Sequence, residues 1–201
     1  MSGRYAIPAA RARFEEEFKK SRFITTLGPI SCAEEANAFV AEVRSTFPDA
    51  SHNCWAFLIG APGTTTTVGM SDDGEPHSTA GRPMLNVLVH SGLGDIVAVV
   101  TRYWGGTKLG KGGLVRAYSS GVQKALRYCE VGEKVEWATL EMSFDYTYVT
   151  GFKLVSPDYE ATIDSEVYGE KALFKIQLPL DKLAGMRDAL TQLTNGSVLF
   201  F

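Results

Sequence analysis

The order of hydrophobic patterns in the last third of the chain limits the possible folds more than any other feature of the sequence. Six segments after residue 134 switch between the alternation of a strand and the spacing of a helix. In chain order they are 137–146 (strand), 148–155 (helix), 161–167 (strand), 173–180 (strand), 183–193 (helix) and 197–201 (strand). This βαββαβ order is typical of the ferredoxin-like fold.

The first 134 residues mix the same two patterns and predict a separate domain, so the fold class is α+β. The expected elements are 13–30 (strand), 31–47 (helix), 53–59 (strand), 67–70 (strand), a helix from 83, 95–102 (strand) and 113–128 (helix). Ser31 and Glu34 have the spacing of a capping box at the start of the first helix. The polar segment 131–136 predicts a turn, and with it the boundary between domains 1–134 and 135–201.

Composition excludes several classes of protein. The chain has 201 residues, of which 45% are hydrophobic and 21% charged, and such a chain folds without a metal or disulfide. The apolar run Ile96–Val100 is far shorter than the about 20 residues that a membrane span needs. The N-terminal residues lack the apolar region of a secretory signal, and Cys32, Cys54 and Cys129 do not form a disulfide or zinc-knuckle pattern. We therefore expect a cytoplasmic protein with no cofactor, no metal and no membrane partner.

A basic stretch without acidic residues runs from Ile96 to Cys129 and contains six Lys or Arg, although the net charge of the chain is −3. Within it, a glycine-rich segment follows a buried strand and opens a helix. Glycines let backbone N–H groups approach an anion, and a helix start adds partial positive charge. We predict an anion or nucleic-acid site with aromatic rings that stack on bases. Its expected residues are Arg102, Tyr103, Trp104, Gly105, Gly106, Lys108, Lys111, Gly112, Gly113 and Arg116.

The same segment resembles one half of a nucleotide-binding P-loop. Gly105 to Lys111 fits the G-x-x-x-x-G-K pattern, but the next residue is Gly112, where a Ser or Thr should bind Mg²⁺. This difference argues against a Walker-type nucleotidase. A tight turn whose aromatic residues belong to the hydrophobic core remains the alternative interpretation.

A second polar segment, Asp72–Arg82, contains three carboxylates and a histidine in eleven residues. Carboxylates so close together can bind a divalent cation or shift one another's pKa for acid–base chemistry. Asp72, Asp73, Glu75 and His77 are therefore the candidate catalytic residues if the protein is an enzyme. The alternative is a solvated loop whose side chains bond to their own backbone, and we favour it, so no catalytic residue is assigned.

Cys54 offers a third, weaker candidate. Strand alternation places Cys54 on the same face as His52, and a Cys–His pair can form a nucleophile. A buried structural cysteine is far more common than a catalytic one. We therefore expect Cys54 to be a packing residue.

Several blocks of the sequence together resemble the IMPACT family and, within it, the bacterial YigZ-like members. The blocks are Lys20–Ile24, His52–Ala56, Ser71–Pro76, Thr79–Gly81, Val99–Gly106 and Lys108–Tyr118. The combination Arg102–Gly106 is the most specific of them. The sequence differs from the family at His77, where relatives carry a small residue. The C-terminal pattern is similar to the small domain of the bacterial members, which resembles the last domain of translocation elongation factors.

The resemblance implies that the first domain has a fold like domain 2 of ribosomal protein S5, with helices on one face of a sheet. It also implies a cytoplasmic protein linked to translation. Our leading hypothesis is a regulatory protein, without catalysis and monomeric, that binds RNA or the ribosome through the glycine-rich basic segment. One alternative is an enzyme that uses residues 72–77 on a small phosphorylated or anionic substrate. Another is an adaptor that binds a translation-regulating protein under stress.

Overall fold

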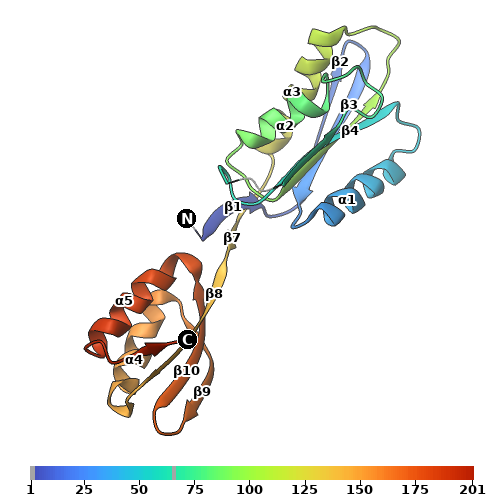
Figure 1. The fold of residues 1–201 in the computed structure, drawn as a ribbon. Coiled ribbons are helices and arrows are strands. Elements are labelled where there is room, and N and C mark those ends of the chain that lie inside the picture. The colour runs from blue at the N-terminus through green and yellow to red at the C-terminus, as the bar shows by residue number, and fades with distance from the viewer. Residues whose placement is uncertain (1–2, 65–66) are drawn as a thin grey trace. The chain divides into compact units, whose positions relative to one another are not determined.

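The computed structural model describes residues 3–64 and 67–201, and the chain separates into two units between Lys134 and Val135 (Figure 1). Residues 5–134 form the first unit. Residues 135–201 form the second, and Gly3 and Arg4 belong with it. The fold class is therefore a two-domain α+β protein. No helix among the described residues is both long enough and apolar enough to cross a membrane.

The first unit is built on a five-stranded antiparallel sheet in the order β2-β3-β6-β4-β5. The strands are β2 (Ala12–Phe18), β3 (Ser21–Pro29), β4 (His52–Ile59), β5 (Thr67–Ser71) and β6 (Ile96–Tyr103). The β-branched run that predicted a buried strand is β6 at the centre of this sheet. The predicted single strand 13–30 is wrong, because Lys19 and Lys20 form a turn that folds it into the β2–β3 hairpin.

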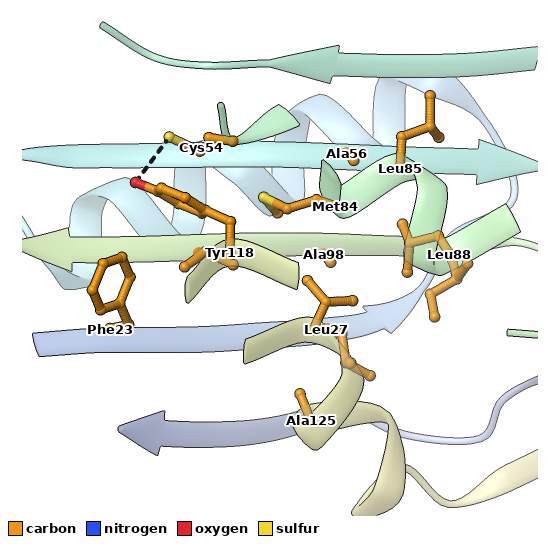
Figure 2. Close-up of a cluster of buried hydrophobic side chains, with 14 of the residues drawn as sticks. Phe23, Leu27, Cys54, Ala56, Met84, Leu85, Leu88, Ala98, Tyr118 and Ala125 are labelled. Atoms are coloured by element: carbon orange, nitrogen blue, oxygen red, sulfur yellow. Dashed lines mark hydrogen bonds between the residues drawn. The ribbon is translucent and has the colours of Figure 1, made fainter. Parts of the chain in front are cut away.

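Both faces of this sheet are covered by helices. Helices α2 (Gly81–Val89) and α3 (Lys111–Arg127) pack on the face that carries the side chains of Leu27, Ala56 and Ala98 (Figure 2). Helix α1 (Ala33–Thr46) packs on the opposite face against Phe57, Val97 and Val99 (Figure 1). The expectation of helices on one face only is therefore wrong. Alternate residues of β6 are buried on both sides, and each apolar face needs its own cover.

Two local expectations are also wrong. Helix α1 begins at Ala33 after Cys32, and no side chain caps it. Instead, the N–H and Oγ of Ser31 donate to Glu35. The segment expected to be a turn is β7 (Val131–Val135), which pairs with β1 (Arg4–Pro8). The polar sequence of β7 did not indicate a strand, because Lys134 is compensated by an ion pair with the buried carboxylate of Asp95. The Asp95 carboxylate also accepts a hydrogen bond from the Tyr5 hydroxyl at 2.8 Å.

The second unit has the expected βαββαβ order. It consists of β8 (Trp137–Phe144), α4 (Val149–Val155), β9 (Thr162–Tyr168), β10 (Ala172–Pro179), α5 (Leu183–Leu193) and β11 (Leu199–Phe200), with short 3₁₀ turns at Tyr146–Tyr148, Ser156–Tyr159 and Leu180–Lys182. The antiparallel sheet has the order β11-β8-β10-β9, the arrangement of a ferredoxin-like domain. Phe144, Phe152 and Phe174 form the centre of its core.

Candidate functional site

A cavity of about 510 Å³ lies where β6 runs into the glycine-rich loop. A volume of this size is typical of small-molecule sites in proteins. The residues that line it come from β4, from the loop after β5, from the end of β6 and from the start of α3. They are His52, Glu75, Pro76, Arg102, Trp104, Lys108, Leu109, Gly110, Lys111 and Leu114.

A buried ion pair forms one wall of this cavity. Arg102 Nη1 donates to Glu75 Oε1 at 2.6 Å, and the two side chains are only 6% and 3% exposed. The Tyr118 hydroxyl donates to the same Glu75 oxygen at 2.8 Å, and Arg102 Nη2 donates to Ser21 Oγ at 3.3 Å. Glu75 therefore neutralises Arg102, which adds no net positive charge to the cavity.

Strand register explains how a charged side chain comes to lie among core residues. Arg102 is opposite Phe23 on β3 and opposite His52 on β4. Alternation along β6 turns Arg102 to the same face as Ala98 and Val100, which is the core between the sheet and α2 and α3. A charge in that position requires a partner, because desolvation of an unpaired ion costs several kcal/mol. The loop after β5 supplies the partner in Glu75.

Tyr118 is the polar group that sequence reasoning missed. The helical spacing marked it as an inward residue of α3, and it is fully buried (Figure 2). Burial, together with the nearby Cys54 and Glu75, raises the pKa of its hydroxyl far above the usual range. Tyr118 thus remains a hydrogen-bond donor to Glu75. A tyrosine within an otherwise apolar helical stripe is the sequence signal for a buried polar partner.

The other wall of the cavity carries positive charge. Lys108 and Lys111 are exposed and have no carboxylate partner among the described residues. Trp104 is 59% exposed. Helix α3 starts after Gly110 without a capping side chain and without an acidic residue in its first turn. The helix start and the two lysines therefore make this wall attractive to an anion.

The glycines of the glycine-rich segment have different structural roles. Gly110 lines the cavity, whereas Gly105, Gly106, Gly112 and Gly113 do not. Gly105 donates its N–H to Ser21 Oγ at 3.2 Å, and a Cβ on Gly105 would lie 1.7 Å from the carbonyl oxygen of Lys20. Gly105 is therefore required for close packing of the loop, not for an open backbone N–H.

Two other predicted residues lie outside the cavity. Tyr103 follows Arg102 on β6 and points to the other side of the sheet, where the Arg22 guanidinium is 5.6 Å from its ring. Arg116 is exposed on α3, five residues beyond Lys111, and does not line the cavity. The structure thus brings together Arg102, Trp104, Lys108 and Lys111 from the predicted set.

The carboxylates of the acidic loop are largely engaged in holding the loop. Partial burial acts to raise the pKa of the Asp72 carboxyl, but hydrogen bonds from the backbone N–H groups of Ser78, Gly81 and Ala80 outweigh it and the pKa is lowered. Asp73 accepts the Asn53 N–H at 2.6 Å and pairs with Arg44. Neither aspartate lines the cavity.

His77 is exposed, bonds to Ser78 at 3.0 Å and does not line the cavity. Of the four candidate catalytic residues, the structure therefore brings only Glu75 to the cavity. No group of three or more His, Cys, Asp or Glu residues within 3–64 and 67–201 is arranged to hold a metal ion.

Cys54 and His52 do not form a pair. The Cys54 thiol is buried and bonds to the carbonyl of Asp72 at 2.9 Å and to the Tyr118 hydroxyl (Figure 2). Burial raises the pKa of this thiol well above its ordinary value, which keeps it unreactive. His52 bonds through Nδ1 to the carbonyl oxygen of Asp73 at 2.8 Å. A carbonyl only accepts, so Nδ1 carries the hydrogen and, in the neutral ring, Nε2 is an acceptor.

The fold and the cavity define a two-domain α+β protein with a cation-lined pocket at the end of an antiparallel sheet. The family model described as the Impact N-terminal domain matches residues 19–126, and the domain of unknown function DUF1949 matches residues 142–197. The chain therefore belongs to the IMPACT family, as its sequence blocks predicted.

Relatives of similar length support this assignment. The chain is 42% identical to the IMPACT family member YigZ of Escherichia coli over 96% of its own length and 95% of that protein. It is 40% identical to an IMPACT family member of Haemophilus influenzae over 97% and 95% of the two chains. A crystal structure described as that of a hypothetical protein is 41% identical, with a TM-score of 0.72 and coverage of 100% and 97%. The resemblance to YigZ-like members is confirmed.

Proposed function

We propose that this protein is a translation-associated regulator that binds single-stranded RNA, free or in the ribosome, at the cavity beside β6. The observation that carries the proposal is the cation-lined wall. Lys108, Lys111 and the uncapped start of α3 surround an exposed Trp104, and the one carboxylate of the cavity, Glu75, is already paired with Arg102. The link to translation follows from the family resemblance.

The cavity suits one unpaired nucleotide better than a duplex. Pro76, Leu109 and Leu114 give it an apolar side, and Trp104 offers an indole face for stacking. Stacking of a base on an aromatic side chain is worth about 1–3 kcal/mol and tolerates any sequence. Lysines at the rim would neutralise phosphates on either side of the inserted nucleotide, which makes binding dependent on salt. Proteins read RNA mainly at such unpaired positions.

Binding fits these side chains better than catalysis does. An enzyme that used the acidic loop would need free carboxylates at the cavity, but Asp72 and Asp73 bond to backbone N–H groups and Glu75 is held by Arg102 and Tyr118. His52 lines the cavity and bonds through Nδ1 to the Asp73 carbonyl, so it would be the candidate for acid–base chemistry there. Positive charge and a stacking surface do not require any of these groups to transfer a proton.

The test is salt-dependent binding of the full chain to unstructured RNA oligonucleotides by fluorescence anisotropy, with sedimentation on ribosomal particles as a second arm. Lys108→Ala/Lys111→Ala should lower the slope of log K against log salt by about 1.4, since each phosphate contact on single strands contributes about 0.7. Trp104→Ala should weaken binding about tenfold or more, as expected for one lost stacking contact. Arg116→Ala is the control, because it removes one positive charge from α3 outside the cavity, and its effect is compared per charge.

Two results would contradict the proposal. The first is wild-type protein that binds neither RNA nor ribosomal particles at low salt. The second is a loss of binding per removed charge that is as large in the Arg116 control as in the Lys108/Lys111 variant, since net charge alone would then explain the effect. Binding to free RNA without sedimentation on ribosomal particles would identify free RNA as the partner.

A further inference from the structure

The turn between β2 and β3 has an unusual sequence for its shape. Phe18 pairs with Ser21, so Lys19 and Lys20 are the whole loop. Their φ angles are 48° and 65°, both in the left-handed region. Two-residue hairpin loops with two positive φ angles favour Asn-Gly or Asp-Gly, because other side chains are strained there. A Lys-Lys pair in this loop is therefore a strained choice.

The Lys19–Lys20 turn packs against the glycine-rich loop at Gly105. The Cα of Gly105 is packed so closely on the Lys20 carbonyl that any side chain would collide with it. In the first turn of α3, a Cβ built on Gly113 would be 3.9 Å from the ring of Phe18, the residue before the turn. Ser21, the next residue of the hairpin, accepts hydrogen bonds from the Gly105 N–H and from Arg102 Nη2. The turn thus adjoins the loop that carries Lys108.

The charges of the two lysines are also uncompensated. Lys19 and Lys20 are exposed, and neither has an ion pair or side-chain hydrogen bond among the described residues. Of the three carboxylates on β2, Glu15 pairs with Arg22 and Glu16 pairs with Lys124. Of these three carboxylates, only that of Glu17 remains to offset part of the positive charge of Lys19 and Lys20. The structure therefore places two uncompensated cations on a turn whose backbone packs against Gly105, in the loop that also carries Lys108.

We propose that the Lys19–Lys20 turn is a second phosphate-binding element, which holds the RNA backbone next to the nucleotide in the cavity. This inference rests on the proposed RNA-binding function and extends its site to the β2–β3 hairpin. Residues with strained backbone cluster at functional sites in proteins. Asn-Gly would relieve the strain but would remove both charges. The Lys19–Lys20 turn therefore lowers the stability of the fold through its strained backbone and strengthens RNA binding through its two charges. One pair of substitutions can test both effects.

The decisive variant is Lys19→Asn/Lys20→Gly. We expect its melting temperature to rise by about 4 °C, because two left-handed positions receive residues that tolerate them. We expect RNA binding to weaken about tenfold and the salt slope to fall by about 1.4, as for two lost phosphate contacts on a single strand. Stability and binding should thus move in opposite directions in the same protein.

Further variants separate charge from strain. Lys19→Gln/Lys20→Gln removes the charges and keeps the left-handed positions occupied by long side chains, so it should lose binding without gaining stability. Lys19→Arg/Lys20→Arg keeps the charges and should bind like the wild type. Lys171→Asn is a control for the loss of one surface charge, because Lys171 is an exposed lysine at the β9–β10 hairpin of the other unit. It should leave RNA binding unchanged.

The outcomes distinguish this inference from the function on which it rests. If wild-type protein binds no RNA, the proposed function fails and the inference fails with it. If Lys108→Ala/Lys111→Ala weakens binding while Lys19→Asn/Lys20→Gly binds like the wild type, the inference is overturned and the proposed function stands. A melting temperature that falls in the Asn-Gly variant would overturn the strain argument.

Discussion

Replacement of Glu75 by Gln tests the energetics of the cavity wall most directly. Gln has nearly the same volume and can still accept from Tyr118, so the change removes little except the negative charge opposite Arg102. Both side chains are more than nine-tenths buried, and removal of one partner from a buried ion pair costs about 3–5 kcal/mol. The free energy of unfolding of a domain is only about 5–15 kcal/mol. We therefore expect Glu75→Gln to lower the melting temperature of this unit by about 12–20 °C.

Tryptophan fluorescence can report on this unit alone. Trp55 and Trp104 belong to residues 5–134, and Trp137 is the one tryptophan of the other unit. In a Trp137→Phe background, urea unfolding followed by fluorescence therefore measures the unit that contains Glu75. This separation matters because a protein of two units need not unfold in one step.

Two comparisons make the result interpretable. Glu15 forms an ion pair with Arg22 in which both side chains are about half exposed, so Glu15→Gln should cost no more than about 1 kcal/mol. Addition of Arg102→Met to Glu75→Gln should recover more than half of the loss, since no unpaired charge then remains buried. A loss from Glu75→Gln as small as that from Glu15→Gln would refute the reasoning. The reasoning would also be refuted if the double variant lost as much free energy of unfolding as Glu75→Gln and Arg102→Met lose together as single variants.

Three further outcomes are expected. Gly105→Ala should lower the free energy of unfolding by about 1–3 kcal/mol or more, measured by urea unfolding, because the new methyl group meets the Lys20 carbonyl. Asp72 has a lowered pKa, so its ionised form stabilises the fold above about pH 4 and this contribution is lost as the pH falls through the folded pKa. Asp72→Asn should therefore be less stable than the wild type at pH 7, and the difference in chemical unfolding curves should shrink as the pH falls through the folded pKa of Asp72. A difference that does not change with pH would contradict this. Cys54 should resist maleimide in the native state and react after unfolding, whereas the partly exposed Cys32 should react in both, as mass spectrometry can show.

Elements that carry one continuous pattern could be predicted from the sequence, and those defined by a partner far along the chain could not. The run Ile96–Val100 indicated a buried strand because both of its faces are apolar. The strand β7 gave no such signal, because its stability comes from pairing with β1 and from Lys134 reaching Asp95. The β2–β3 hairpin was also missed, since Lys-Lys stands where a turn sequence would be expected.

Some features of the candidate site could likewise be predicted from the sequence, and others could not. Lys108 and Lys111 could be placed at one helix start, because a glycine-rich segment between strand and helix fixes the local backbone. The role of Asp72 could not be read from the sequence, since an aspartate that accepts three backbone N–H groups looks the same as a catalytic one. Arg102 was predicted to bind an anion. The sequence did not indicate its ion pair with Glu75, because the two residues are 27 positions apart in the chain.

The chain passes from one unit to the other twice, once after Arg4 and once after Lys134. Arg4 joins Glu160 at 2.7 Å and Asp181 at 3.3 Å, and the Gly3 carbonyl accepts the Glu136 N–H. A single cut at the junction therefore removes Gly3 and Arg4, together with their ion pairs and backbone hydrogen bond, from the C-terminal piece. Recombination that exchanged one unit for another would need two crossovers, which favours inheritance of the pair as a whole.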